Sequence, residues 1–151
     1  MLFRSEENRF DESLEKATKT LDLYRANFGT HYDNYATALI ICGLSLTKTG
    51  QANEAGKILR EAVKIRTDSL PKEHFWVALA NDALGECLAT QERYDEAEPL
   101  LLQSYESLKS SQGATNPRTR LALQRLVTLY DDWGKFDTAK TYRNKLVEAK
   151  F

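Results

Sequence analysis

Residues 93–101 (RYDEAEPLL) decide the fold, because the order of residue types in this segment returns at a fixed distance along the chain. Small residues recur every 42 positions at Ala55, Ala97 and Ala139, and Asp or Asn recurs at Asp11, Asn53, Asp95 and Asp137. Self-similarity at such a fixed period is the sequence signature of a repeat architecture. We therefore expect an array of 42-residue units.

Each unit contains two patterns that are typical of amphipathic helices. The first pattern marks the first helix of each unit, which we call a first-type helix. It has apolar or small residues at i, i+3, i+4 and i+7, as in Leu39, Cys42, Gly43 and Leu46, and again in Leu123, Leu126, Val127 and Tyr130. The second has an apolar face of Ala55, Leu59, Ala62 and Val63, followed in the next unit by Ala97, Leu101, Ser104, Tyr105 and Leu108. Small residues at Gly43 and Gly85 should let paired helices approach closely.

The turns between helices carry capping signals. Asp and Asn are strong N-cap residues, so we expect Asp11, Asn53, Asp95 and Asp137 to cap the second helices, with Asp95 and Glu98 forming a capping box. Tyr94 and Phe136 should fill the space under the turns. Asn116 and Pro117 predict a cap and a first helical residue for the last first-type helix.

Gly85, Tyr94 and Ala97 resemble the signature of tetratricopeptide repeats. The 42-residue step, RYDEAEPLL and residues 116–119 (NPRT) resemble the kinesin light chain variety, and the C-terminal half also resembles the tetratricopeptide tail of some bacterial serine/threonine kinases. HEAT and armadillo repeats have a similar length but do not explain the Asp/Asn series. The resemblance implies an all-α fold, a right-handed α-solenoid (superhelix) of antiparallel helix pairs with about seven helices.

The expected organisation is a single domain over residues 1–151. Residues 1–28 would be the orphan second helix of a truncated repeat, and residues 29–70, 71–112 and 113–151 would be helix pairs. The unpaired face of residues 10–28 should stack on a missing helix or another subunit. The last helix is expected to be a polar capping element, because it carries Lys140, Arg143, Asn144 and Lys145.

Composition excludes several classes of protein. Lys and Arg number 21 and Asp and Glu 22, which gives a net charge of −1 and argues against a nucleic-acid partner. No stretch is apolar enough to span a membrane, and no signal peptide opens the chain. Two cysteines, Cys42 and Cys87, make no disulfide framework; we expect buried thiols in a reducing cytoplasm.

The sequence predicts neither an enzyme nor a cofactor or metal site, because it has no phosphate-binding Gly-rich loop, HExxH or CxxC. His31 and His74 are interpreted as loop residues. Trp76 and Trp133 are expected to pack between repeats, with partner anchoring as the alternative. Asp131 and Asp132 are interpreted as a solvated helix end or part of a charged groove rather than a catalytic dyad.

The resemblance also implies where a partner binds, since first helices line the concave face of such arrays. The groove positions carried over are Thr37, Ile40, Leu44, Thr47 and Lys48, then Leu79, Asp82, Glu86, Ala89 and Thr90, then Leu121, Gln124, Thr128, Asp131 and Asp132. This surface would be apolar at one side and acidic toward the other.

Two features of related repeats are missing. The adjacent asparagines of kinesin light chains are replaced by Ile40 and Ile41, Asp82 and Ala83, and Gln124 and Arg125, and the basic carboxylate clamp of chaperone-binding members is absent. The predicted function is a non-enzymatic protein–protein interaction module that holds a peptide or protein segment, a basic one if the acidic side is used. The alternative is a structural, oligomerisation or in-cis regulatory scaffold within a larger repeat or kinase protein.

Overall fold

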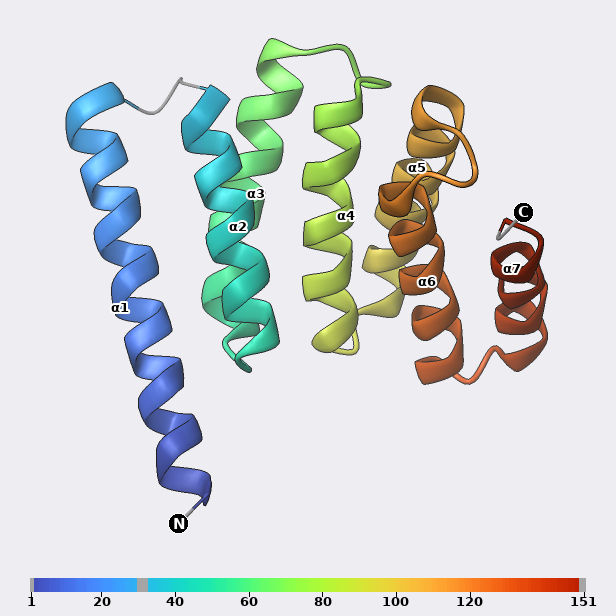
Figure 1. Ribbon diagram of the computed structural model, residues 1–151, viewed down its shortest axis with the longest axis horizontal. Coiled ribbons are helices and arrows are strands. Elements are labelled where there is room, and N and C mark those ends of the chain that lie inside the picture. The colour runs from blue at the N-terminus through green and yellow to red at the C-terminus, as the bar shows by residue number, and fades with distance from the viewer. Residues whose placement is uncertain (1, 30–32, 150–151) are drawn as a thin grey trace. The chain divides into compact units, whose positions relative to one another are not determined.

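A computed structural model describes the backbone of residues 2–29 and 33–149, and their side chains except those of residues 2–11, 13 and 28. Over these ranges the chain forms seven α-helices and no strand (Figure 1). The helices are α1 (Leu2–Phe28), α2 (Asp33–Lys48), α3 (Ala52–Ser69), α4 (Phe75–Thr90), α5 (Tyr94–Gln112), α6 (Pro117–Asp132) and α7 (Phe136–Glu148). The predicted all-α fold is confirmed.

The chain divides into two compact units, Met1–Ser69 and Leu70–Phe151. In the first, α2 packs against α1 and α3; in the second, α4 packs on α5, α5 on α6 and α6 on α7, and α4 also contacts α6. Consecutive helices within each unit run antiparallel (Figure 1). The pairs α2/α3, α4/α5 and α6/α7 fall in the ranges expected for the repeats, and a single domain over residues 1–151 stays a prediction.

Helices of the first two pairs meet where a leucine fills the space beside a glycine. A Cβ added to Gly85 in α4 would lie 2.6 Å from Leu101 Cδ2 in α5, and Gly43 in α2 meets Leu59 in α3 in the same way. Real Cβ atoms do not approach carbon this closely, so only glycine fits at this helix spacing. The predicted role of the small residues is confirmed here.

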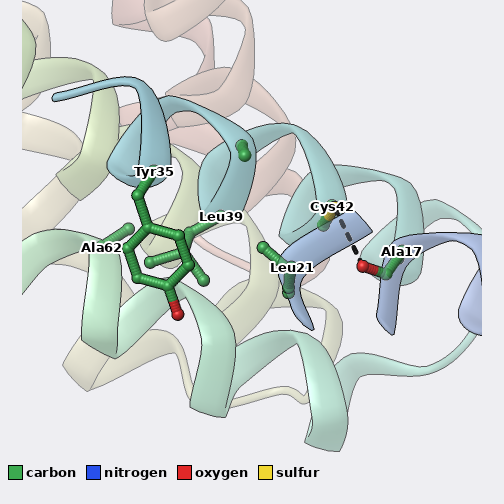
Figure 2. Close-up of a cluster of buried hydrophobic side chains, with 7 residues drawn as sticks. Ala17, Leu21, Tyr35, Leu39, Cys42 and Ala62 are labelled. Carbon is green, nitrogen blue, oxygen red and sulfur yellow. Dashed lines mark hydrogen bonds between the residues drawn. The ribbon is translucent and has the colours of Figure 1, made fainter. Parts of the chain in front are cut away.

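The core of the first unit joins all three of its helices. Figure 2 shows its labelled side chains, which come from α1 (Ala17, Leu21), α2 (Tyr35, Leu39, Cys42) and α3 (Ala62). The Cys42 thiol donates to the Ala17 carbonyl across 3.9 Å, and burial raises the pKa of this thiol. The buried Tyr35 hydroxyl accepts a hydrogen bond from Arg25 (2.7 Å) and donates one to Glu61 (2.9 Å). This polar link ties α1 to α3 through α2.

The predicted capping by the Asp/Asn series is wrong. Because α5 begins at Tyr94 and α7 at Phe136, Asp95 and Asp137 lie inside the first turns, and the N-cap residues are Arg93 and Lys135 without a side-chain cap. An acidic side chain is favourable anywhere in a first turn, where it faces the positive end of the helix dipole, so the residue type alone does not locate the cap.

The other two caps predicted from this series fail similarly. Asn53 follows the first residue of α3, and Asp11 lies within α1, although its side chain is outside the described set. The capping box also fails, since Glu98 forms an ion pair with Lys135 at 3.8 Å.

Capping of the first-type helices follows the prediction more closely. The Asn116 side chain accepts a hydrogen bond from the Arg118 amide at 2.9 Å, with Pro117 as the first helical residue. Forty-two residues earlier, His74 Nδ1 accepts from the Trp76 amide at 3.1 Å and caps α4. His74 therefore has a structural role in the loop, while His31 lies outside the described residues.

Turns after the first-type helices need a backbone in the left-handed region. Positive φ angles occur 42 residues apart at Gly50 (79°), Glu92 (59°) and Gly134 (78°). The equivalent position at the start of the chain is Asn8, where α1 continues without a break from Leu2. The helix α1 therefore begins eight residues before the position that corresponds to the start of α3.

Glu92 is the one non-glycine residue among these three, and L-residues with a Cβ are strained there. We predict that Glu92→Gly raises the free energy of unfolding by about 0.5–1 kcal/mol, since the strain relieved exceeds the entropy that glycine loses. Urea denaturation with Glu92→Ala as the matched control tests this. An equal gain with alanine would assign the effect to the Glu92 charge instead.

Candidate functional site

In α2, the predicted groove positions are mostly occupied by interactions within the unit. Thr47 is buried and its hydroxyl donates to the Gly43 carbonyl at 2.8 Å. The Thr37 hydroxyl accepts a hydrogen bond from Arg66 at 2.8 Å. Ile40 and Leu44 are half-buried and Lys48 is exposed. Neither of the two cavities described below is lined by any of these five positions.

In the second unit, seven predicted positions line one cavity of about 230 Å³ between α4 and α6. Leu101 from α5 and Leu129 from α6 add apolar walls, and Arg125 adds a cation. The predicted positions brought together are Glu86, Ala89, Thr90, Leu121, Gln124, Thr128 and Asp132, whereas Leu79, Asp82 and Asp131 do not line it. The structure thus gathers positions that are far apart in sequence.

A second cavity of about 360 Å³ adjoins the first. The two cavities share Leu121 and Gln124, both exposed residues of α6. The second is lined in addition by Thr115, Pro117 and Arg120 near the start of α6 and by Leu146 of α7. The two cavities therefore make a surface that follows α6 along most of its length.

The charges at the middle of this surface are paired. Arg125 of α6 donates to Asp82 Oδ2, and its second terminal nitrogen lies 2.8 Å from Glu86 Oε2. Asp82 is only 3% exposed, and burial lowers the pKa of Arg125 to about 10, so the guanidinium stays charged at neutral pH. The expectation that Asp82 lies on an open acidic face is wrong, because Arg125 covers and neutralises it.

The paired carboxylates at the end of α6 differ from each other. Arg143 of α7 donates to Asp131 Oδ2, while Asp132 is exposed and lines the smaller cavity. Burial chiefly raises the pKa of Tyr94, and the negative charges of Glu92 and Asp132 raise it further. Asp132 is therefore a solvent-facing carboxylate at the acidic end of the cavity.

Trp133 packs inside an aromatic cluster at the turn between α6 and α7. Its ring stacks on Tyr94 (centroids 5.7 Å apart) and on Tyr130 (6.5 Å), and Lys135 Nζ lies 3.5 Å from its ring centroid. Tyr142 continues the cluster, 5.5 Å from Tyr130. The predicted packing role of Trp133 is confirmed.

Two other aromatic expectations fare differently. Phe136 is 67% exposed, so the prediction that it fills the space under its turn is wrong. Tyr94, 42 residues earlier, instead stacks on the Trp133 ring.

Trp76 is 37% exposed and meets the Phe75 ring edge-on, with the ring centroids 4.9 Å apart. The Arg118 guanidinium lies 5.0 Å from the Phe75 ring centroid.

Sequence reasoning missed a buried polar group in the first unit. Arg66 of α3 is 2% exposed and donates to Asp33 Oδ1 (3.2 Å), the Asp33 carbonyl (2.9 Å) and the Thr37 hydroxyl. The signal was present, because the residues 42 positions further on are all apolar: Phe75, Leu79 and Leu108. Three positions that change from polar to apolar together indicate that their side chains meet.

Cys42 and Cys87 are free and buried. Leu23 of α1 is 63% exposed, but the side chains of Phe10 and Phe28 lie outside the described set, so stacking through this face stays a prediction. None of the described helices is long and apolar enough to cross a membrane.

Residues 76–150 match the family model described as tetratricopeptide repeat. Residues 76–150 belong to the tetratricopeptide repeat family. Tetratricopeptide repeats generally mediate protein–protein interaction and typically act as non-enzymatic scaffolds. The comparison with curated proteins found no match.

Solved structures show the same fold. A putative kinesin light chain from Podosopora anserina with nearly identical TPR-like repeats is 16% identical, with a TM-score of 0.72 over 95% of this chain and 68% of that one. A substituted form of it gives 0.75 over the same shares, also at 16% identity. BtubC (BKLC) from P. vanneervenii is 14% identical, with a TM-score of 0.64 over 99% of this chain and 74% of that one. The predicted resemblance to kinesin-light-chain-like repeats is confirmed for the fold.

The buried pair in this tetratricopeptide unit makes a stability prediction. Asp82→Leu should lower the free energy of unfolding by up to about 3–5 kcal/mol, because it removes the more buried of the two carboxylates that pair with Arg125 and leaves only Glu86. Asp82→Leu combined with Arg125→Met should recover most of the loss, since apolar side chains replace buried pairs at little cost. Urea unfolding of the single and double variants measures the coupling. A double variant as unstable as the single one would contradict it.

The tyrosine cluster predicts a loss of stability in alkali. Burial raises the pKa values of Tyr105, Tyr130 and Tyr142, so the folded chain holds these protons more tightly than the unfolded chain does. The free energy of unfolding should therefore fall as the pH rises above about 10, the pKa of an unfolded tyrosine. Thermal unfolding between pH 9 and 11 tests this, and Tyr130→Phe should make the fall shallower; an unchanged slope would count against Tyr130.

Proposed function

We propose that this chain is a non-enzymatic interaction module whose second unit binds a peptide segment of a partner protein along α6. The cavity of about 230 Å³ between α4 and α6 carries this proposal. Its leucine walls, Leu101, Leu121 and Leu129, offer burial to one apolar side chain, which is the usual source of affinity in such a site.

The rim of the cavity supplies groups that suit a peptide backbone. Gln124 and Thr128 are exposed on α6, and Thr90 is exposed at the end of α4. An amide side chain both donates and accepts hydrogen bonds, and a hydroxyl does the same, so each of these residues matches a peptide N–H or C=O. Leu121, half exposed at 50%, lies between the two cavities and gives a ligand apolar area to cover.

Electrostatics favours a basic residue at only one end of the segment. Arg125 pairs with both Asp82 and Glu86, which leaves one net negative charge in that group, and Arg143 neutralises Asp131. Asp132 is the carboxylate that faces solvent in the cavity, so a basic side chain of the ligand should lie beside it. The two free, buried cysteines support a reducing cytoplasm as the place where the module works.

A displayed peptide library tests the proposal with two matched variants of the full chain. Thr128→Trp fills the cavity from an exposed position of α6, and Thr141→Trp makes the same change at an exposed position of α7 outside both cavities. Peptides selected on the unchanged chain should bind Thr128→Trp at least about tenfold more weakly and Thr141→Trp with unchanged affinity. Equal binding to all three proteins, or no selected peptide, would reject the groove.

A further inference from the structure

The charges of α6 are arranged against its own dipole. In α2, α3, α5 and α7 an acidic residue lies in the first turn and a basic residue in the last turn. In α6 the first turn instead carries Arg118 and Arg120, and the last turn carries Asp131 and Asp132. A helix N-terminus is positive and a C-terminus negative, so each of these four charges faces a like partial charge.

Partners within the fold explain two of the four charges. Arg118 lies over the Phe75 ring, and Asp131 pairs with Arg143. Arg120 and Asp132 form no ion pair with any residue of the described ranges. Departures from locally favourable sequence are expected where a site is built for binding.

These two charges stand at opposite ends of the surface along α6. Arg120 lines the cavity of about 360 Å³, and Asp132 lines the cavity of about 230 Å³. Twelve residues separate them, which is about 18 Å along a helix. The shared residues Leu121 and Gln124 lie between them.

The neighbouring helix α4 strengthens this polarity. At the starts of the two helices, Phe75 of α4 lies against Arg118 of α6. Further along, Glu86 pairs with Arg125. At the C-terminal ends, Thr90 and Asp132 line the same cavity. The two helices therefore run parallel, as Figure 1 shows, and their dipoles add. One end of the surface is positive in both side chains and backbone, and the other end is negative in both.

We propose that this surface selects a charge-segregated peptide, with an acidic residue beside Arg120, a basic residue beside Asp132 and an apolar side chain between them in the smaller cavity. The inference rests on the proposed function and adds the charge pattern of the ligand. An extended chain rises about 3.3 Å per residue, so the two charged residues should be about five or six positions apart.

Segregated and mixed peptides of one composition, with an all-basic peptide for comparison, test the pattern. The segregated peptides place two Glu and two Lys at opposite ends of a short apolar centre, in both chain orders; the mixed peptide alternates the same charges, and an all-basic peptide replaces Glu with Lys. At low salt, one segregated order should bind the 151-residue chain at least about tenfold more tightly than the mixed or all-basic peptide. Affinities within about twofold of one another would overturn the proposal.

Single charge reversals give a second, independent readout. Arg120→Glu should weaken the segregated peptide and favour the all-basic one, and it should also raise the thermal midpoint, because a carboxylate now lies at the N-terminus of α6. Lys140→Glu is the matched control, an exposed Lys of α7 outside both cavities. If the thermal midpoint rises but the preference among the peptides is unchanged, Arg120 does not contact the ligand and the proposed charge pattern is wrong.

The two proposals fail in different ways. Suppose that the unchanged chain binds segregated and mixed peptides equally well and that Thr128→Trp abolishes the binding of both. The groove is then correct and the charge pattern is wrong. If no peptide binds, or Thr128→Trp has no effect, the proposed function fails and the charge pattern with it.

Discussion

A leucine side chain packed into the space beside a glycine sets the spacing of the first two helix pairs. Gly43 with Leu59 and Gly85 with Leu101 occupy the same two places in successive 42-residue units. Since a Cβ at either glycine would overlap the leucine, the helices of these two pairs can pack at this spacing only with glycine at the contact. The third pair has Val127 and Arg143 at these places, and Arg143 binds Asp131 across the pair. The same architecture thus admits a polar contact where the close apolar one is lost.

The repeat pattern predicted the helices and their buried faces well, because a buried face must be apolar or small at fixed intervals. Ala55, Ala97 and Ala139 are all fully buried as expected. Helix starts were predicted less well. Asp95 is compatible with an N-cap and with a first turn. Glu92, in the turn between α4 and α5, is a residue type that rarely adopts a positive φ, and only its place midway between Gly50 and Gly134 marks it. The cap expected at Asp11 failed for a related reason, since α1 runs through that position without a break from Leu2.

Positions on the candidate surface were easier to predict than its charges. Helix geometry carries a face from one first-type helix to the next, which is why seven expected positions of α4 and α6 line one cavity. The charge of that face depends on which long side chain reaches across. Arg125 reaches Asp82, 43 residues earlier, and also pairs with Glu86, so the centre of the expected acidic surface holds paired charges with a net charge of only −1. The 42-residue period relates equivalent positions of the repeats. It does not predict a contact such as that between Arg125 and Asp82, which are not at equivalent positions.

Arg66 with Asp33 and Thr37 shows what the period leaves free. The same three places hold Leu108, Phe75 and Leu79 in the next unit, so the exchange from polar to apolar involves the whole set. A hybrid with one member from each set would bury a guanidinium beside hydrocarbon or leave a hydroxyl without its donor. Units related by duplication can therefore diverge only by compensated groups of changes. Once such groups differ, each 42-residue unit fits only its own place in the array, and exchanging single segments between units becomes unfavourable.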